Sequence, residues 1–477
     1  MAPFKNGWRL IKGVEYLPTV ISPELQTFLT GRKLLLDEIP YPEKLIQQHQ
    51  ENGCITANQG IIQSGNQLKC ERCGNTTTHL FAEYPCARCQ KKCTYCRSCI
   101  MMGRVSTCTS LLQWTGPAPL NQFIHSPLEW EGSLSPGQQT ASEKVKTAIL
   151  SKSQLLIWAV CGAGKTEILF EGINEALSKN LRVCIATPRT DVVLELAPRF
   201  QKVFPSIDVA ALYGGSEDRH KYAPLTITTT HQLFRFFEAF DVVIVDEVDA
   251  FPYSYDRTLQ WAVEKAAKPN AAKIYLTATP NEEWQSDCKT GKRSYVTIPA
   301  RFHRHQLPVP EFAWCGNWKK SFEKGKIPPM IENWIQSRLQ EGKQALIFLP
   351  NIKLMEKTAK YFQRLHPKIE TVHAEDRDRK AKVERMRNKE TPILLTTTII
   401  ERGVTFPNID VAVVGAEDGI FTEAALVQIS GRVGRSAQHP TGTITFFHYG
   451  RTKAMNKAYK HIIEMNKEAK ERGLIDG

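Results

Sequence analysis

The sequence contains no apolar run long enough to cross a membrane, and its N-terminus, MAPFKNGWRL, lacks the apolar region of a signal peptide. It also lacks low-complexity tracts and short-period repeats. We therefore expect a cytoplasmic protein with no transmembrane segment of its own. Disulfide bonds are rare in that reducing compartment, so the 13 cysteines must serve another purpose.

The overall composition bounds the function without identifying it. The 477 residues are 42% hydrophobic, which is ordinary for globular proteins and suggests about three or four domains. The formal net charge is +13. Such an excess favours partners that carry phosphates, although a ribosomal or membrane-surface role would also fit.

Short, wholly apolar runs alternate with amphipathic segments from Leu134 onward, a pattern typical of parallel strands that are covered by helices on both faces. Two series of such runs predict two α/β domains. The first series comprises 155–158, 183–186, 242–245 and 274–276, and the second comprises 345–348, 393–395, 411–414 and 444–447. The expected units are an N-terminal region (1–66), a cysteine-rich module (67–115), a first domain (134–306), a linker (307–329) and a second domain (330–477). We interpret the basic tail, 451–472, as a helix with a solvated face rather than a docking site, although it could track a phosphate backbone.

A phosphate-binding loop is indicated by the segment from Ala159 to Thr166, which follows the first apolar run and precedes an amphipathic segment. Gly162 and Gly164 would allow main-chain N–H groups to turn toward phosphates. Lys165 would contact the β- and γ-phosphates of ATP, and the Thr166 hydroxyl would coordinate Mg²⁺.

Two further segments complete an ATPase site. Asp246 and Glu247 follow the run 242–245, at the strand end where ligands bind in open α/β sheets. Asp246 would hold Mg²⁺ and Glu247 would orient the attacking water. The segment 428–435 supplies Arg432 and Arg435, which could reach phosphate across a cleft between the domains. The alternatives, an ordinary acidic loop and a surface turn with solvated arginines, do not explain why all the segments occur together.

In this order the segments resemble the superfamily 2 helicases, whose core consists of two RecA-like domains. The resemblance rests on 134–138, 159–166, 187–189, 228–230, 246–249, 277–279, 396–398, 401–404 and 428–435. It implies a catalytic set of Lys165, Asp246, Glu247, Gln428, Arg432 and Arg435. The implied ATP-binding residues are Gln138, Gly162, Ala163, Gly164, Lys165, Thr166, Asp246, Glu247, Arg432 and Arg435. The implied contacts to a nucleic-acid backbone are Thr187, Pro188, Arg189, Thr229, Thr230, Thr396 and Thr397.

Eight of the cysteines lie close together ahead of the first α/β domain, and all of them except Cys108 occur with Cys-x₂-Cys spacing. They are Cys70, Cys73, Cys86, Cys89, Cys93, Cys96, Cys99 and Cys108. Such pairs indicate structural zinc, since four thiolates complete a tetrahedral site, whereas a redox motif needs a single pair. Eight thiols match two zinc ions, or one ion with four spare thiols.

A cysteine module ahead of a superfamily 2 core resembles the ComFA family of late-competence ATPases. The resemblance is carried by 70–73, 95–99, 103–105 and 299–305. It implies that Cys70, Cys73, Cys96 and Cys99 form the usual zinc site. This sequence departs from the simplest family pattern by carrying the other four cysteines as well, and these could hold a second, nested zinc. It also implies an ATP-dependent translocase that drives single-stranded DNA through a membrane channel during transformation. ComFC, DprA and the channel protein would then be partners, the location would be the inner face of the cell membrane, and a homo-oligomer is possible.

Two other functions stay open at this point. A replication-restart helicase of the PriA type also combines cysteine pairs with this motor, although its cysteines lie inside or after the core. A zinc-dependent DNA-binding scaffold would use ATP only as a conformational switch. Basic and aromatic residues are interleaved in the cysteine block, which suits single-stranded DNA or, equally, a small aromatic core.

Overall fold

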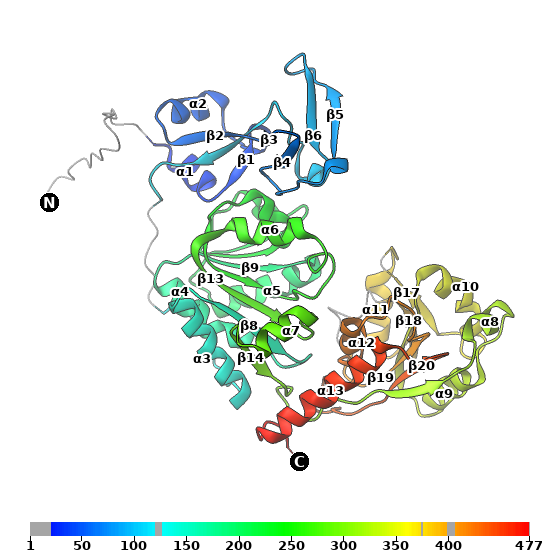
Figure 1. Ribbon diagram of the computed structural model, residues 1–477. Helices are drawn as coiled ribbons and strands as arrows, with labels where there is room; N and C mark the ends of the chain where they lie inside the picture. The colour runs from blue at the N-terminus through cyan, green and yellow to red at the C-terminus, as the bar shows by residue number, and fades with distance from the viewer. Residues whose placement is uncertain (1–20, 120–125, 374, 398–405, 477) are drawn as a thin grey trace.

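The computed structural model describes residues 21–119, 126–373, 375–397 and 406–476. The chain forms an N-terminal module and two domains that are each built on a parallel sheet (Figure 1). Among the described residues, no helix combines the length and the apolar character that crossing a bilayer requires.

The N-terminal module is one unit in which the cysteine-rich block is enclosed between paired strands. Its central antiparallel sheet has the order β1-β7-β2, so β7, which follows the cysteines, pairs with two strands that precede them. The boundary expected between 66 and 67 falls inside a hairpin of β3 and β4. The elements are α1 (Pro23–Leu29), β1 (Lys33–Leu35), α2 (Glu43–Glu51), β2 (Ile55–Gln59), β3 (Ile61–Ser64), β4 (Gln67–Cys70), β5 (Phe81–Pro85), β6 (Lys92–Cys96) and β7 (Ser110–Trp114).

The first RecA-like domain has a seven-stranded parallel sheet of order β10-β11-β9-β12-β13-β8-β14. The four apolar runs predicted from the sequence lie in β8, β9, β12 and β13. Its strands are β8 (Gln154–Ala159), β9 (Val183–Thr187), β10 (Val209–Leu212), β11 (Leu225–Thr229), β12 (Phe240–Val245), β13 (Ala267–Thr277) and β14 (Tyr295–Ile298). Its helices are α3 (Pro136–Leu150), α4 (Phe170–Ser178), α5 (Thr190–Val203), α6 (Arg257–Ala266) and α7 (Glu282–Lys289).

Alternate side chains of each central strand enter different cores. Leu155 and Ile157 pack in the core that contains α3, α4 and α5, whereas Leu156 packs with α6 on the opposite face. The second core also contains Cys70 and Cys99 of the N-terminal module. The module is therefore packed directly onto the first RecA-like domain and is not tethered at a distance.

The second RecA-like domain has a six-stranded parallel sheet of order β15-β20-β19-β16-β18-β17. The segment expected to be a linker contributes its edge strand, β15 (Glu311–Trp314), and helix α8 (Trp318–Glu323). The other strands are β16 (Gln344–Phe348), β17 (Glu370–Val372), β18 (Ile393–Thr396), β19 (Ile409–Val414) and β20 (Ile444–His448). The other helices are α9 (Pro329–Gln340), α10 (Ile352–Gln363), α11 (Arg379–Arg387), α12 (Glu423–Ser430) and α13 (Lys453–Glu471).

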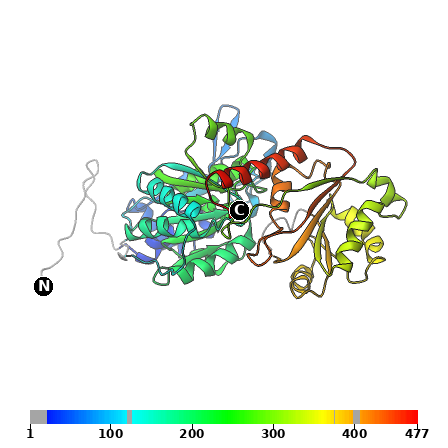
Figure 2. The ribbon, with the colours of Figure 1, turned by 90° about the horizontal axis from the view of Figure 1, so that it is seen from below.

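Helix α13 crosses from the second domain to the first (Figure 2). Its apolar stripe is buried, and near its C-terminal end Ala469 packs against Ala300 of the first domain. Just beyond the helix, Arg472 Nη1 donates hydrogen bonds to Thr297 O (3.2 Å) and Thr297 Oγ1 (2.9 Å). One side of the basic tail therefore packs against both domains, and we call α13 the strap helix. This packing corrects the interpretation of the tail as a solvated helix.

Candidate active site

The phosphate-binding loop leaves the carboxyl end of β8 and turns on two glycines. Gly162 has φ +84° and Gly164 has φ +69°, values that favour glycine because it has no Cβ. Gln138, which begins α3 together with its cap Ser135, lies against the loop. Its Nε2 donates hydrogen bonds to Ala163 O (2.9 Å) and Gly164 O (3.3 Å). Gln138, one of the residues expected to bind ATP, therefore contacts the loop that would hold the phosphates.

Lys165 and the acidic residues after β12 face one another at the same sheet edge. Lys165 Nζ lies 4.0 Å from Asp246 Oδ1. Burial disfavours the charge of Lys165, but Asp246, Cys161 and Glu247 outweigh burial and raise the pKa of this lysine. Burial also raises the pKa of Asp246, against the opposing effect of Lys165. The pair thus forms a compact charged centre, which fits a magnesium-bound triphosphate through the Asp246 carboxylate and the Thr166 hydroxyl.

Glu247 has φ +55°, an uncommon conformation for a residue with a Cβ. Its N–H donates a 2.8 Å hydrogen bond to Asp246 Oδ1. Strained backbone of this kind clusters at active sites, as expected for a metal ligand followed by a water-orienting base.

Asp249 connects the acidic turn to the end of the neighbouring strand β13. Its carboxylate accepts hydrogen bonds from Thr277 Oγ1 and Thr279 Oγ1, both at 2.7 Å. The two threonines belong to the segment 277–279, one of those on which the helicase resemblance rests. The acidic turn is therefore held directly to the residues at the end of β13 and just after it.

Gln428 joins the two domains across the cleft. Its Oε1 accepts a 3.0 Å hydrogen bond from Cys161 Sγ of the phosphate-binding loop, and its Nε2 lies 3.4 Å from Asp249 Oδ2. A Cβ on Gly431 would lie 2.5 Å from Cys161 Cβ, so only glycine allows this approach. The segment 428–435 is thus packed against the phosphate-binding loop. Within it Arg432 is 2% exposed, and Arg435 Nε donates a 3.0 Å hydrogen bond to Gly431 O.

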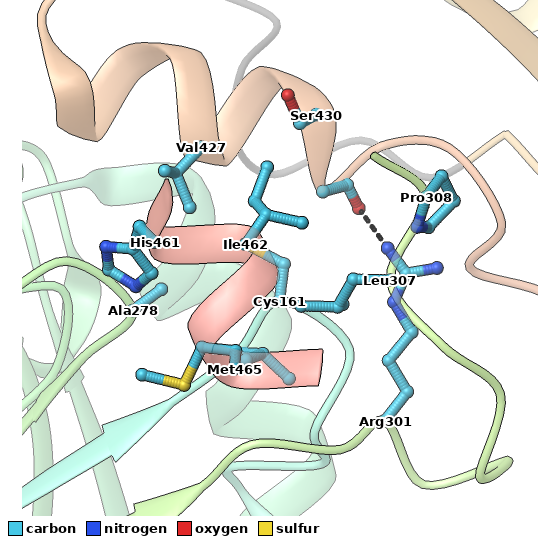
Figure 3. A pocket seen from close by; sticks show the side chains of 12 residues that line it. Cys161, Ala278, Arg301, Leu307, Pro308, Val427, Ser430, His461, Ile462 and Met465 are labelled. Atoms are coloured by element: carbon cyan, nitrogen blue, oxygen red, sulfur yellow. Dashed lines mark hydrogen bonds between the residues drawn. The ribbon is translucent and has the colours of Figure 1, made fainter. Parts of the chain in front are cut away.

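Arg301 belongs to the segment 299–305, for which the sequence gave a family resemblance but no role. It is 1% exposed and reaches from the first domain to the end of α12 (Figure 3). Its guanidinium donates hydrogen bonds to the carbonyl groups of Val433 (2.7 Å), Gly434 and Gly431 (3.5 Å). The next residue, Phe302, donates its N–H to Gly162 O at 3.2 Å. One short segment therefore holds both the phosphate-binding loop and the turn that carries Arg432 and Arg435.

The residues expected to contact nucleic acid follow the ends of strands in both sheets. Thr187 ends β9, Thr229 ends β11 and Thr396 ends β18, and all three side chains are buried. Pro188 and Arg189 follow Thr187, while Thr230 and Thr397 follow the other two. Arg189 binds the Asp191 carboxylate through two hydrogen bonds of 3.0 and 2.6 Å. Thr398 and the segment 401–404 lie outside the described residues. Contact with nucleic acid stays a prediction for all of them.

The eight clustered cysteines form two separate tetrads, the quartet that the family resemblance implied and the group expected for a second zinc. One tetrad is Cys70, Cys73, Cys96 and Cys99, and the other is Cys86, Cys89, Cys93 and Cys108. In the first, Sγ–Sγ distances are 3.8 Å for Cys70–Cys99 and 3.7 Å for Cys73–Cys96. Tetrahedral zinc with Zn–S bonds of about 2.3 Å requires sulfurs about 3.8 Å apart. The donor set and its spacing therefore fit a structural metal ion.

The first tetrad lies at the junction with the motor. Lys265 of α6 donates a 2.7 Å hydrogen bond from Nζ to Arg72 O, between two of the cysteines. Gly74 packs against the Trp261 ring so closely that a Cβ would clash with it. Buried Arg72 forms an ion pair with Glu38. Four thiolates with Zn²⁺ carry two net negative charges, which these buried cations would balance.

The second tetrad is built on the β5–β6 hairpin, which extends away from the motor (Figure 1). Cys86 Sγ lies 3.6 Å from Cys108 Sγ, and Cys89 Sγ lies 3.2 Å from Cys93 Sγ. Arg104 packs over the Tyr84 ring at 4.6 Å, and that ring lies edge-on to Tyr95. These aromatic residues form a small local core on the hairpin, and Tyr95 is also bridged to Ser106 in the segment that leads to Cys108.

Three regions of the chain match known families. Residues 18–113 match the competence protein ComFA N-terminal domain, 131–282 match the type III restriction enzyme res subunit, and 326–437 match the helicase conserved C-terminal domain. The structure of the Mycobacterium smegmatis helicase Lhr bound to ssDNA and AMP-PNP has a TM-score of 0.51 at 17% identity. The match covers 70% of this chain and 48% of that one, and it supports the fold alone.

Two relatives match over nearly the full length of both chains. The competence protein ComFA of Bacillus subtilis is 50% identical over 94% of this chain and 96% of its own length. The ComFA protein of Streptococcus pneumoniae is 37% identical over 93% of this chain and 98% of its own. Together with the two RecA-like sheets and the cysteine tetrads, these matches show that the chain is a superfamily 2 helicase-like ATPase that belongs to the ComFA family.

Proposed function

We propose that this protein is an ATP-dependent single-stranded-DNA translocase that drives DNA import during natural transformation. The observation that carries the proposal is the position of Gln428, which is hydrogen-bonded to Cys161 of the phosphate-binding loop in the opposite domain. Nucleotide binding at that loop is thereby linked to the relative position of the two domains. Membership of the ComFA family supports DNA uptake as the process that this linkage serves.

The residues at the cleft divide the work of hydrolysis among them. Main-chain N–H groups around Gly162 and Gly164, with Lys165, hold the phosphates. Mg²⁺ held by Thr166 and Asp246 would neutralise charge that develops on the phosphates. Glu247 orients and deprotonates the attacking water, while Arg432 and Arg435 stabilise the transferred phosphoryl group from the other domain.

Domain closure around ATP would then move two grips on one strand relative to each other. The grips are the carboxyl ends of β9 and β11 in the first domain and of β18 in the second, where the threonines lie. Contacts of this type bind phosphates and sugars, so they position a strand without reading its sequence. A translocase that imports DNA must bind strands of any base sequence, and contacts of this type meet that requirement.

The cysteine tetrads would hold two structural Zn²⁺ ions, because four thiolates leave no open coordination position. The first would fix the N-terminal module on the motor domain, and the second would shape the projecting β5–β6 hairpin. We extend the proposal to association with ComFC, DprA and the membrane channel, at the cytoplasmic face of the membrane. Family membership supports these partners, and a homo-oligomer is compatible with them.

The deciding experiment is the steady-state ATPase rate with no nucleic acid, with single-stranded DNA, with duplex DNA and with RNA, at fixed salt. Fixed salt matters because phosphate contacts weaken steeply as salt rises. Strong stimulation by single-stranded DNA alone is expected. Equal or stronger stimulation by duplex or RNA would contradict the link to strand import. A rate indifferent to all three would favour a scaffold that uses ATP as a switch.

A further inference from the structure

A second cavity lies between the N-terminal module and the first RecA-like domain, away from the ATP cleft. The module contributes Arg32 and Glu38 to its wall, and the domain contributes Arg219, His220 and Arg235. Gln232, together with phenylalanine and leucine side chains, completes the lining. The charged residues thus converge from two structural units on one pocket.

Arg32 is the most buried of these charges. It is 3% exposed, and it packs over the Phe28 ring at 4.6 Å. Its Nη2 donates a 2.9 Å hydrogen bond to Lys221 O. Within the described part of the chain, no other hydrogen-bond acceptor and no carboxylate ion-pair partner contacts this guanidinium. A buried guanidinium has five N–H donors, so several are left to face the cavity.

The cavity wall carries more positive than negative charge. Glu38 supplies the carboxylate among the lining residues. Its Oε1 lies 2.9 Å from Arg235 Nε and 3.7 Å from Arg219 Nη2. The same carboxylate also pairs with Arg72. Burial and the charges of Arg182 and Arg235 lower the pKa of Arg32 to about 9, so it is still protonated at neutral pH. Charge of one sign in a site of low dielectric is costly unless a counter-ion binds there.

We propose that this cavity binds a phosphate group, held between Arg32 of the N-terminal module and Arg219 and Arg235 of the first RecA-like domain. A phosphate carries up to two negative charges and presents several oxygens, so it can accept hydrogen bonds from guanidinium groups on different sides. It would also bridge the module and the motor. The source is either a phosphodiester of a nucleic-acid strand or a free phosphate, inorganic or nucleotide-borne.

The test measures binding of radiolabelled inorganic phosphate by equilibrium dialysis at fixed ionic strength. The full chain is used with Lys165→Ala, which weakens the phosphate-binding loop and separates this site from ATP hydrolysis. One phosphate per chain is expected outside that loop. Arg219→Ala in this background should lower its affinity about 10- to 100-fold, since a charge-assisted contact is lost. The Arg219 side chain is 47% exposed, so the fold should tolerate the change. Arg32→Gln provides a second test from the module side.

The charge-matched control is Lys202→Ala, on the exposed surface of α5 and outside the cavity. Phosphate binding that is absent, or that is unchanged by Arg219→Ala, would overturn the proposal. An equal loss in Lys202→Ala would also overturn it, because the effect would then be one of net charge. Displacement of the label by an oligodeoxythymidine without terminal phosphates identifies a nucleic-acid source, whereas displacement by ADP alone identifies a free phosphate.

Discussion

Arg301 and Val433 belong to different RecA-like domains, yet Arg301 Nη1 donates a 2.7 Å hydrogen bond to Val433 O. The carbonyl lies between Arg432 and Arg435 in the sequence. The guanidinium is buried, so water does not compete for this bond. The contact therefore fixes the main chain that carries both arginines, and it does so from the domain that binds ATP.

We predict that Arg301→Lys lowers kcat for ATP about 10- to 100-fold while leaving ATP affinity unchanged. A lysine keeps the charge, but its ammonium group cannot reach the carbonyls of Val433, Gly434 and Gly431 together. A small displacement of Arg432 and Arg435, which would act on the transition state, is enough to lower kcat by this factor. Turnover with saturating single-stranded DNA and binding of a fluorescent ATP analogue give the two quantities.

A double-mutant cycle separates positioning from general stability. If Arg301 acts through the segment 428–435, adding Arg301→Lys to Arg435→Ala should slow turnover no further. Multiplying losses would instead indicate an unrelated structural effect. Arg257→Lys on α6 is the matched control, because it makes the same change outside the cleft.

Loss of hydrolysis should be separable from loss of DNA binding. We predict that Lys165→Ala and Glu247→Gln each abolish ATP turnover while single-stranded DNA affinity changes less than about threefold, because the phosphate contacts of the strand lie at other strand ends. Anisotropy of a labelled oligonucleotide without nucleotide measures that affinity. A parallel loss of DNA binding in both folded variants would contradict two separate sites.

The two cysteine tetrads should differ in what their loss does. We predict two zinc ions per chain in the wild type and one in either Cys70→Ala or Cys86→Ala, since each variant breaks one tetrad. Cys70→Ala should also destabilise the first motor domain, because Cys70 lies in a core shared with that domain. Cys86→Ala should leave basal ATPase activity and motor stability unchanged.

Zinc content by elemental analysis and thermal unfolding check both halves of this prediction. Unchanged zinc in Cys70→Ala would remove that residue from the ligand set. Equal destabilisation by the two variants would contradict the distinction between a tetrad in the shared core and one on a projecting hairpin.

The sequence predicted the central strands from local signals, since runs such as 242–245 are apolar throughout. It indicated the motifs of the ATP site by their co-occurrence, because Asp246 and Glu247 follow such a run in a chain that also carries the phosphate-binding segment. Edge strands were harder to predict from the sequence. Strand β15 has only four residues, all partly exposed, and it lies in a segment with proline and glycine on either side.

Contacts between distant segments could not be read from the sequence. The role of Arg301 depends on three carbonyl groups about 130 residues away. Every residue has a main-chain carbonyl, so the residue types do not indicate which carbonyls accept these hydrogen bonds. The strap helix was misjudged for a related reason. Its lysines dominate its composition, although its smaller apolar residues recur every three or four positions and are buried.

The strap helix α13 should hold the two domains at a distance suited to hydrolysis. Ala469 is fully buried against the first domain, so Ala469→Asp would place a charge in an apolar contact and detach this end of the helix. We expect a wider spread of interdomain distances by single-molecule fluorescence transfer and a several-fold lower ATPase rate, because Arg432 and Arg435 would meet the phosphate-binding loop less often. Lys467→Asp puts the same charge on the exposed face of the same helix and should change neither quantity. An unchanged distance distribution in Ala469→Asp would mean that Gln428 and Arg301 hold the cleft without the strap.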